Sequence, residues 1–158
     1  MEKPVINFYR VGEEWGEFSN FFKAEIWIDE ETWPTTEHYF QAQKFPSQHE
    51  IQQKIRNFEK PGQAASFARK HSGLRPDWEQ VKDDVMREAL RAKFTQHQNL
   101  KKLLLDTKDA KIVEASPTDS YWGNATRKDG SEGLNKLGLL LMEIRETLAN
   151  EHEENKGT

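Results

Sequence analysis

The residues of this chain that could do chemistry together lie in one stretch, Trp33 to Phe45, which reads WPTTEHYFQAQKF. A carboxylate, an amide and an amine recur there at Glu37, Gln41 and Lys44. At 3.6 residues per turn, Gln41 and Lys44 fall within about 40° of Glu37 on a helix surface. The stretch therefore predicts a polar stripe that can grip opposite ends of a small polar group.

The two charged ends of this stripe suggest different roles. A glutamate such as Glu37 can act as a general acid or base, and a lysine such as Lys44 can act as a charge clamp or an amine nucleophile. Glu37 would lie in the first turn of the helix, where the helix dipole stabilises a carboxylate, so a base or an orienter of water is the simpler assignment. The alternative, which spacing alone leaves open, is a solvated helix face. More aromatic residues flank the stripe than a free surface usually carries, namely Trp33, Tyr39, Phe40 and Phe45.

Other candidate residues carry weaker signals. Asn20, in FSNF, is either a turn former or a ligand contact. Asp119 and Trp122, in SPTDSYWG, could supply a carboxylate and a stacking platform, although the Ser-Pro before them is also typical of a helix start. Asn135, near the start of the last helical pattern, is more typical of a cap. These residues remain open between structural and binding roles.

Composition limits the class of protein. The chain has 158 residues, the size of one ordinary domain, and a formal net charge of -4, so binding of duplex nucleic acid by charge alone is disfavoured. It has no cysteine, which excludes disulfides and thiolate chemistry and fits a reducing compartment. The first ten residues have no apolar signal core, and no apolar run approaches the roughly 18 residues of a membrane span. We therefore expect a cytoplasmic protein without a membrane partner.

Known cofactor motifs are missing from the sequence. The five histidines include no H-E-x-x-H pair, and there is no Walker loop or G-x-G-x-x-G. We therefore expect neither a metal nor an organic cofactor.

The elements that must position these residues follow from hydrophobic periodicity. A small antiparallel sheet is predicted by VINFY together with AEIWID and ETWP, which a turn at Asp29 to Glu31 joins. A strand or extended segment is predicted by AKIVEAS. Helical patterns are expected from Thr35 to a break at Pro46, from a Ser47–Glu50 capping box to about Phe58, over 61–73, from an Asp77 cap to Phe94, over 99–106 and over 134–150.

The fold class is therefore mainly α (α+β), a single domain over 1–150 with a small antiparallel β element from the N-terminal segment. A disordered tail is expected over 151–158, which is polar and charged. Residues 116–133 hold three glycines and little apolar content, and so predict a long loop of a length that is uncommon unless the loop binds something.

Several stretches together resemble one known family, the NADAR family. FSNF, WPTTEHYFQAQKF, DWEQVKDDVMREALRAKF, SPTDSYWG and GLNKLGLLLMEIR occur in the family's order, from about Ile6 to Arg145. The resemblance implies a mainly helical single domain and a hydrolase of N-glycosyl bonds. Bacterial members are described as N-glycosidases for phosphorylated ribosylamino-pyrimidine intermediates of riboflavin biosynthesis. Other members remove ADP-ribose from modified guanine in nucleic acid.

The resemblance also implies site residues. The family's catalytic pair falls on Glu37 and Lys44, and its pocket residues fall on Asn20, Gln41, Asp119, Trp122 and Asn135. The chain departs from the family after Gly123, where NATRKDGSEG is longer and more polar than the usual short glycine-rich turn. Both substrate classes therefore stay open, with nucleic acid considered only as a modified substrate, and the oligomeric state is not predicted.

A covalent role for Lys44 needs a neutral amine. Helical rise separates the backbones of Glu37 and Lys44 by about 10 Å. At an effective dielectric constant near 20, the carboxylate favours the protonated lysine by about 1.7 kcal/mol and raises its pKa by about one unit. Apolar burial must overcome this effect, and Trp33, Phe40 and Trp122 are expected to provide it. Otherwise Lys44 would act as a clamp on a substrate oxygen. Two other classes of protein also stay open, a module that binds ADP-ribose without cleaving it and a helical interaction protein.

Overall fold

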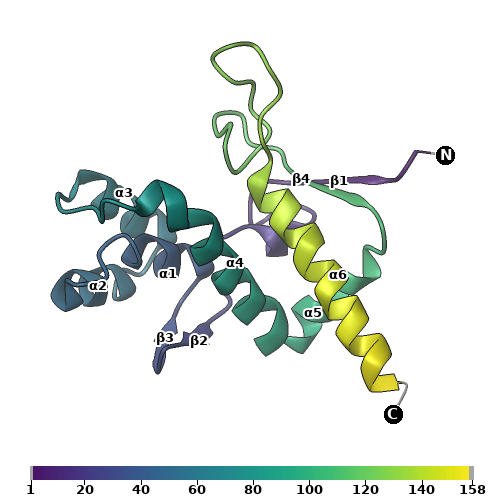
Figure 1. The fold of residues 1–158 in the computed structure, drawn as a ribbon, viewed down its shortest axis with the longest axis horizontal. Coiled ribbons are helices and arrows are strands. Elements are labelled where there is room, and N and C mark those ends of the chain that lie inside the picture. The colour runs from purple at the N-terminus through teal and green to yellow at the C-terminus, as the bar shows by residue number, and fades with distance from the viewer. Residues whose placement is uncertain (1, 157–158) are drawn as a thin grey trace. The chain divides into compact units, whose positions relative to one another are not determined.

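The computed structural model describes residues 2–156, and the chain forms two compact units. The central unit comprises Asn20–Gln96, and the terminal unit comprises the residues up to Ser19 together with those from His97 onward. Over the described residues there are six α-helices and four short strands (Figure 1). The predicted mainly helical class with a small antiparallel β element is confirmed. A single domain over 1–150 stays a prediction.

A β-hairpin opens the central unit. Strands β2 (Ile26–Ile28) and β3 (Glu31–Trp33) pair antiparallel with Ile28 opposite Glu31. The two residues between them, Asp29 and Glu30, have φ angles of 52° and 65°, the left-handed geometry of a tight two-residue turn that matches strand twist. The predicted hairpin and turn are confirmed.

Four helices follow the hairpin: α1 (Thr36–Ala42), α2 (His49–Arg56), α3 (Pro61–Lys70) and α4 (Trp78–Gln96). Helix α1 packs against each of the other three. Every residue of α1 is buried, so this short helix is the centre of the unit rather than a surface element. Its apolar neighbours in the core include Ile26, Trp33, Phe45, Ile55, Ala64, Ala68 and Ala89.

The ends of the helices differ in part from the sequence prediction. Helix α1 begins where the helical pattern was expected to begin, and Thr35 caps it, because the Thr35 hydroxyl accepts a hydrogen bond of 3.1 Å from the amide of His38. The helix ends at Ala42, well before Pro46, so Lys44 lies just beyond it. The Ser47–Glu50 capping box is wrong, because α2 begins at His49 after Gln48.

The cap predicted at Asp77 is also not a side-chain cap. The Asp77 carboxylate instead accepts two hydrogen bonds, of 2.6 and 3.0 Å, from the guanidinium of Arg75. A bidentate pair with arginine competes successfully with the free amides of the first turn of α4.

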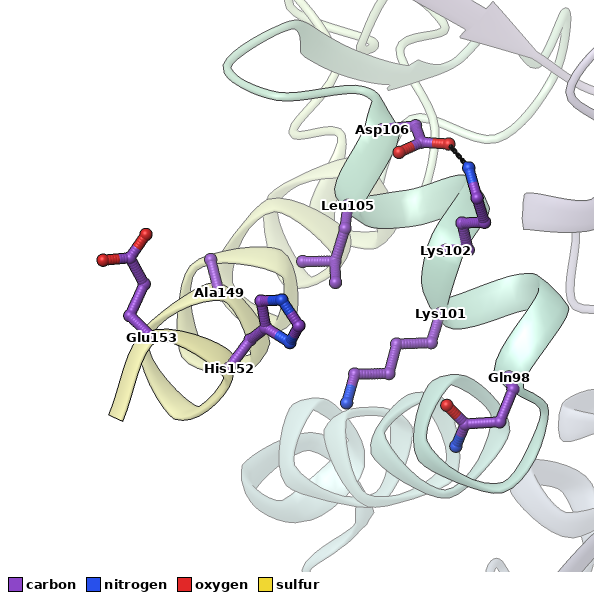
Figure 2. Close-up of a pocket in the computed structure, with 8 residues that line it drawn as sticks. All are labelled: Gln98, Lys101, Lys102, Leu105, Asp106, Ala149, His152 and Glu153. Atoms are coloured by element: carbon purple, nitrogen blue, oxygen red, sulfur yellow. Dashed lines mark hydrogen bonds and ion pairs between the residues drawn. The ribbon is translucent and has the colours of Figure 1, made fainter. Parts of the chain in front are cut away.

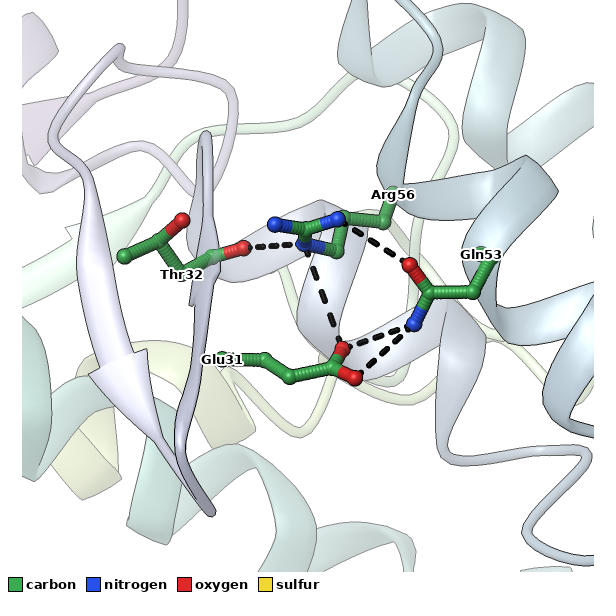
Figure 3. A network of polar contacts seen from close by, with 4 residues as sticks. All are labelled: Glu31, Thr32, Gln53 and Arg56. Atoms are coloured by element: carbon green, nitrogen blue, oxygen red, sulfur yellow. Dashed lines mark hydrogen bonds and ion pairs between the residues drawn. The ribbon is translucent and has the colours of Figure 1, made fainter.

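Polar contacts tie the hairpin to the helices of the central unit (Figure 3). The Glu31 carboxylate accepts hydrogen bonds of 2.9 and 2.8 Å from Gln53 Nε2, and Arg56 Nε donates to the carbonyl of Thr32 at 2.7 Å. At the other strand, the Gln96 amide exchanges two hydrogen bonds of 2.8 Å with the backbone of Trp27. These contacts use backbone groups of the two edge strands that would otherwise be unpaired.

The terminal unit contains β1 (Val5–Phe8), a short 3-10 helix (Gly16–Phe18), α5 (Gln98–Asp106), β4 (Lys111–Glu114) and α6 (Lys136–Lys156). Strand β1 pairs in parallel with β4, so it does not join an antiparallel sheet. Helix α6 packs on β4 and on α5. Gly138 permits this approach, because a Cβ there would lie 2.1 Å from the carbonyl oxygen of Ile112.

The last helix is longer than predicted. Helix α6 continues to Lys156, so the expected disordered tail is wrong for 151–156, and 157–158 lie outside the described residues. The predicted long loop is confirmed between β4 and α6 (Figure 1). Within residues 2–156, no helix is both long and apolar enough to cross a membrane.

Candidate active site

The predicted stripe on α1 lies inside the protein. Glu37 and Gln41 are only 8% and 7% exposed. Gln41 Nε2 donates to Glu37 Oε1 at 3.2 Å, one helical turn away. This burial contradicts the alternative of a solvated helix face and leaves a role in packing or in chemistry. A buried carboxylate held by an amide is the kind of group that active sites use.

The amide of Gln41 has one group without a partner. Because a carboxylate only accepts hydrogen bonds, the contact with Glu37 fixes Nε2 toward Glu37 and turns Oε1 away. Gln41 Oε1 is buried and has no hydrogen-bond partner among the described residues. An unsatisfied buried acceptor costs free energy of about 1–3 kcal/mol and calls for an explanation beyond stability.

Asn20 joins the stripe through the start of α1. Its carbonyl accepts a hydrogen bond of 3.2 Å from the backbone amide of Glu37. Its side-chain Oδ1 accepts one of 2.8 Å from the Thr36 hydroxyl. The structure therefore brings Asn20, Glu37 and Gln41 together in the central unit.

Lys44 follows directly after α1. Its amide donates to the carbonyl of Gln41 at 3.3 Å, and its carbonyl accepts from Arg75 at 3.0 Å. The Nζ atom lies 5.9 Å from the ring centroid of Phe40 and 5.8 Å from that of Trp78. The amine is thus placed beside two aromatic rings, one from α1 and one from the start of α4.

These surroundings lower the pKa of Lys44 below its ordinary value. Burial is the largest cause because it disfavours the charged amine, while the carboxylate of Glu37 acts in the opposite direction. The positive charges of Arg69 and Lys82 lower the pKa further, and Glu79 raises it. The net direction is the one that a nucleophilic amine requires.

The aromatic residues around Lys44 are only partly those expected. Phe40 has the predicted place. Trp33 instead packs edge-on against Tyr39, with 5.6 Å between the ring centroids, and Trp78 contacts the amine. Trp122 belongs to the terminal unit. Sequence reasoning missed Trp78 as a neighbour of the site, because it assigned this residue only to the apolar face of its helix.

His38, between the site residues of α1, is held for structure. Its Nδ1 lies 2.8 Å from the Thr35 hydroxyl, and its Nε2 lies 2.9 Å from the carbonyl of Phe58. Because a carbonyl only accepts, the proton is on Nε2. Burial lowers the pKa of His38, so the ring is neutral at pH 7 and ties α1 to the end of α2.

The other three predicted residues lie in the terminal unit, around the loop between β4 and α6. Asp119 Oδ1 accepts hydrogen bonds of 2.9 and 2.8 Å from the amides of Tyr121 and Trp122, as a turn-forming aspartate does. Gly123 follows in a tight place, since a Cβ there would lie 2.8 Å from the Ser116 side chain.

Asn135 closes the same loop. Its Oδ1 accepts from the amide of Glu114 at 3.0 Å, and its Nδ2 donates to the carbonyl of Ile112 at 3.0 Å. Its backbone has a φ of 52°, a conformation that asparagine tolerates better than most residues. The side chain thus connects the start of α6 to β4, and a contact with substrate stays a prediction.

The terminal unit also has a cavity of about 440 Å³ between α5 and α6 (Figure 2). Lys101, Leu105, Ala149 and His152 are among its lining residues, and none of the predicted site residues lines it. Over the described residues, no group of three or more His, Asp or Glu side chains is close enough to hold a metal ion.

The fold and the stripe together define a small, mainly helical protein with a buried carboxylate and a desolvated amine, a combination suited to acid–base or amine chemistry. The chain belongs to the NADAR family, since the NADAR domain matches residues 7–149. It is 49% identical over 150 residues to N-glycosidase YbiA of Escherichia coli, covering 94% of this chain and 91% of that protein.

Other proteins are also similar to this chain over most of its length. N-glycosidase Npun_R5314 of Nostoc punctiforme is 43% identical, covering 92% of this chain and 94% of that protein. The chloroplastic riboflavin biosynthesis protein PYRR of Zea mays is 41% identical, covering 91% of this chain but 25% of the maize protein. The NMR structure of E. coli YbiA matches with a TM-score of 0.86 at 50% identity, covering 98% of this chain and 90% of that one.

Proposed function

We propose that this protein is an N-glycosidase that hydrolyses the N-glycosidic bond of phosphorylated ribosylamino-pyrimidine intermediates of riboflavin biosynthesis. The names of its relatives, N-glycosidase and riboflavin biosynthesis protein, support this reaction class and pathway. The observation that carries the proposal is the pairing of buried Glu37 with Lys44, whose pKa is lowered by burial beside Phe40 and Trp78.

The geometry supports a covalent route. The neutral Lys44 amine attacks the anomeric carbon of the ribose, the bond from that carbon to the base nitrogen breaks, and the base leaves with a proton. The proton lost by the lysine passes to Glu37 and from Glu37 to the leaving base nitrogen, so Glu37 is again a carboxylate. Opening of the sugar ring, with transfer of the remaining proton from the lysine nitrogen to the ring oxygen, gives an imine between Lys44 and the sugar. Water then adds to the imine carbon with Glu37 as base, which releases the sugar phosphate and restores the amine.

The neighbouring residues have supporting roles in this proposal. Gln41 holds the Glu37 carboxylate through its Nε2. Asn20 is proposed as a pocket residue beside Glu37, whose backbone amide donates to the Asn20 carbonyl. For Asp119, Trp122 and Asn135, contact with the substrate stays a prediction of the family resemblance. The alternative role for Lys44 is a charged clamp on a substrate oxygen, but the lowered pKa favours the nucleophile.

The substrate class rests on charge as well as on the relatives. The chain carries a formal net charge of -4, which suits a small phosphorylated molecule better than a long polyanion. ADP-ribosylated guanine is the second substrate to test, since its sugar presents the same anomeric carbon. The lack of cysteine fits a reducing compartment, and we propose the cytoplasm as the site of action.

The experiment is product formation from two substrates, the ribosylamino-pyrimidine phosphate and ADP-ribosylated guanosine. Glu37→Gln and Lys44→Ala should abolish release of the base, whereas Glu50→Gln and Lys54→Ala should not, because both control residues are exposed. Lys54 is a matched control, since its Nζ also lies over an aromatic ring, at 4.9 Å from the centroid of Phe67. Inactivity on both substrates with retained binding of ADP-ribose would make the protein a binding module instead.

A further inference from the structure

Thr36 carries a buried hydroxyl that the proposed reaction does not use. The residue is 1% exposed and is the first residue of α1. Its Oγ1 lies 2.8 Å from Asn20 Oδ1 and 3.3 Å from the Asn20 carbonyl oxygen. A hydroxyl has a single proton to donate, and the shorter contact is the one to the side chain.

This contact decides which end of the Asn20 amide is free. With Oδ1 occupied by the Thr36 hydroxyl, Nδ2 points the other way. Asn20 is 9% exposed, and its Nδ2 has no hydrogen-bond partner within residues 2–156. This atom is not fully enclosed by the protein, so a ligand can reach it. The group that Asn20 offers to a ligand is therefore a hydrogen-bond donor.

The position of Asn20 next to Glu37 limits what this donor can bind. The Asn20 carbonyl accepts from the amide of Glu37, so the two residues are held together at the start of α1. A phosphate bound at Asn20 would be repelled by the Glu37 carboxylate. A hydroxyl group has no such conflict, because it accepts from an amide and donates its own proton to a carboxylate.

We propose that Thr36 is a positioning residue, which orients the Asn20 amide so that Nδ2 donates to a hydroxyl of the substrate sugar. This proposal rests on the proposed function for the identity of the substrate. The Thr36 hydroxyl then touches no substrate itself but affects substrate affinity, because it orients the Asn20 amide.

Two variants of Thr36 separate the hydroxyl from the shape of the side chain. Thr36→Val keeps the shape and removes the hydroxyl, whereas Thr36→Ser keeps the hydroxyl. We expect Thr36→Val to raise KM about tenfold with kcat changed less, and Thr36→Ser to stay within about twofold of wild type. Equal effects of the two variants would overturn the proposal.

A double-mutant cycle tests whether Thr36 acts through Asn20. In an Asn20→Ala background, Thr36→Val should change KM no further, because the amide that it orients is gone. A full additional tenfold loss in that background would show that Thr36 acts elsewhere. The melting temperature of each variant identifies misfolding, and Thr36→Ala replaces Thr36→Val if the valine does not fold.

A binding measurement distinguishes failure of this proposal from failure of the proposed function. Ribose 5-phosphate is titrated into ¹⁵N-labelled protein, and the side-chain NH₂ signals of Asn20, assigned by their loss in Asn20→Ala, are followed. We expect these signals to shift in wild type and Thr36→Ser and to shift only at about tenfold higher sugar concentration in Thr36→Val. Unchanged signals in wild type would contradict the proposal, whether or not the protein turns over a substrate.

Discussion

Lys44 Nζ lies 5.8 Å from the ring centroid of Trp78, a residue 34 positions later in the sequence. The stripe alone predicts a raised pKa for Lys44, because the Glu37 carboxylate favours the charged amine. In the structure, burial has the larger effect and lowers the pKa of Lys44, so the amine can be neutral closer to physiological pH.

The pH dependence of activity should respond to charges that do not touch the substrate. Because the pKa of Lys44 is lowered, the rising limb of kcat/KM should have its midpoint below the ordinary lysine value of about 10.5. Arg69→Gln removes a positive charge that lowers this pKa, so the limb should move to higher pH by a few tenths of a unit, because Arg69 is exposed and screened. Arg69→Lys, with the charge kept, should not move it.

Glu79→Gln should move the same limb in the opposite direction. Glu79 raises the pKa of Lys44 and also pairs with Lys82 at 2.5 Å, so its removal leaves two positive charges less compensated. The pH–rate profile of this variant, compared with that of Arg69→Gln, checks the sign. A shift of both variants in one direction would contradict Lys44 as the titrating group.

Lys44→Met should stabilise the fold while it abolishes activity. A base whose folded pKa is lowered destabilises the native state at pH values below that pKa, and the cost disappears as pH rises toward the unfolded value near 10.5. We expect a gain of about 0.5–1 kcal/mol in the free energy of unfolding at pH 7, measured by urea denaturation. The gain should shrink at pH 10, and a gain independent of pH would point to packing alone.

Gln41→Met should separate activity from stability. The variant removes the hydrogen bond that holds Glu37 and also the buried oxygen without a partner, so the free energy of unfolding should change by less than about 1 kcal/mol. Initial rates should fall about tenfold or more, because the carboxylate loses its orientation. Gln43→Met, just after the same helix, serves as the control and should keep wild-type rates.

Asn135→Ala should destabilise the terminal unit. It removes two hydrogen bonds to β4 and places alanine at a φ of 52°, for a combined cost of about 2–4 kcal/mol. Urea denaturation measures the loss. Asn135→Gly relieves the backbone strain, so it should recover part of the stability, and no difference between the two variants would show that the backbone conformation contributes little.

The sequence predicted local features better than distant ones. The β2–β3 hairpin, the start of α1 next to Thr35 and the shared face of Glu37 and Gln41 depend on residues close in sequence, and all are present. The parallel pairing of β1 with β4 joins segments about a hundred residues apart, and no local pattern encodes it. The contact of Lys44 with Trp78 depends on how α1 packs against α4, which periodicity does not specify.

The helix caps predicted from the sequence at Asp77 and Ser47 are absent. Asp77 bonds to Arg75 instead of the helix amides, and α2 begins without the capping box at Ser47. The prediction of a disordered tail was wrong for another reason. The polar composition of 151–156 does not prevent these residues from extending a helix whose earlier turns are already packed.

Borohydride trapping on the wild-type protein, during turnover of the ribosylamino-pyrimidine phosphate, tests directly whether Lys44 is the nucleophile. Reduction of an imine would leave the sugar phosphate attached to the protein, and peptide mass spectrometry would locate it. We expect an adduct on Lys44 that is absent without substrate and absent in Lys44→Arg. Turnover without any lysine adduct, or with an adduct on another lysine, would contradict Lys44 as the nucleophile.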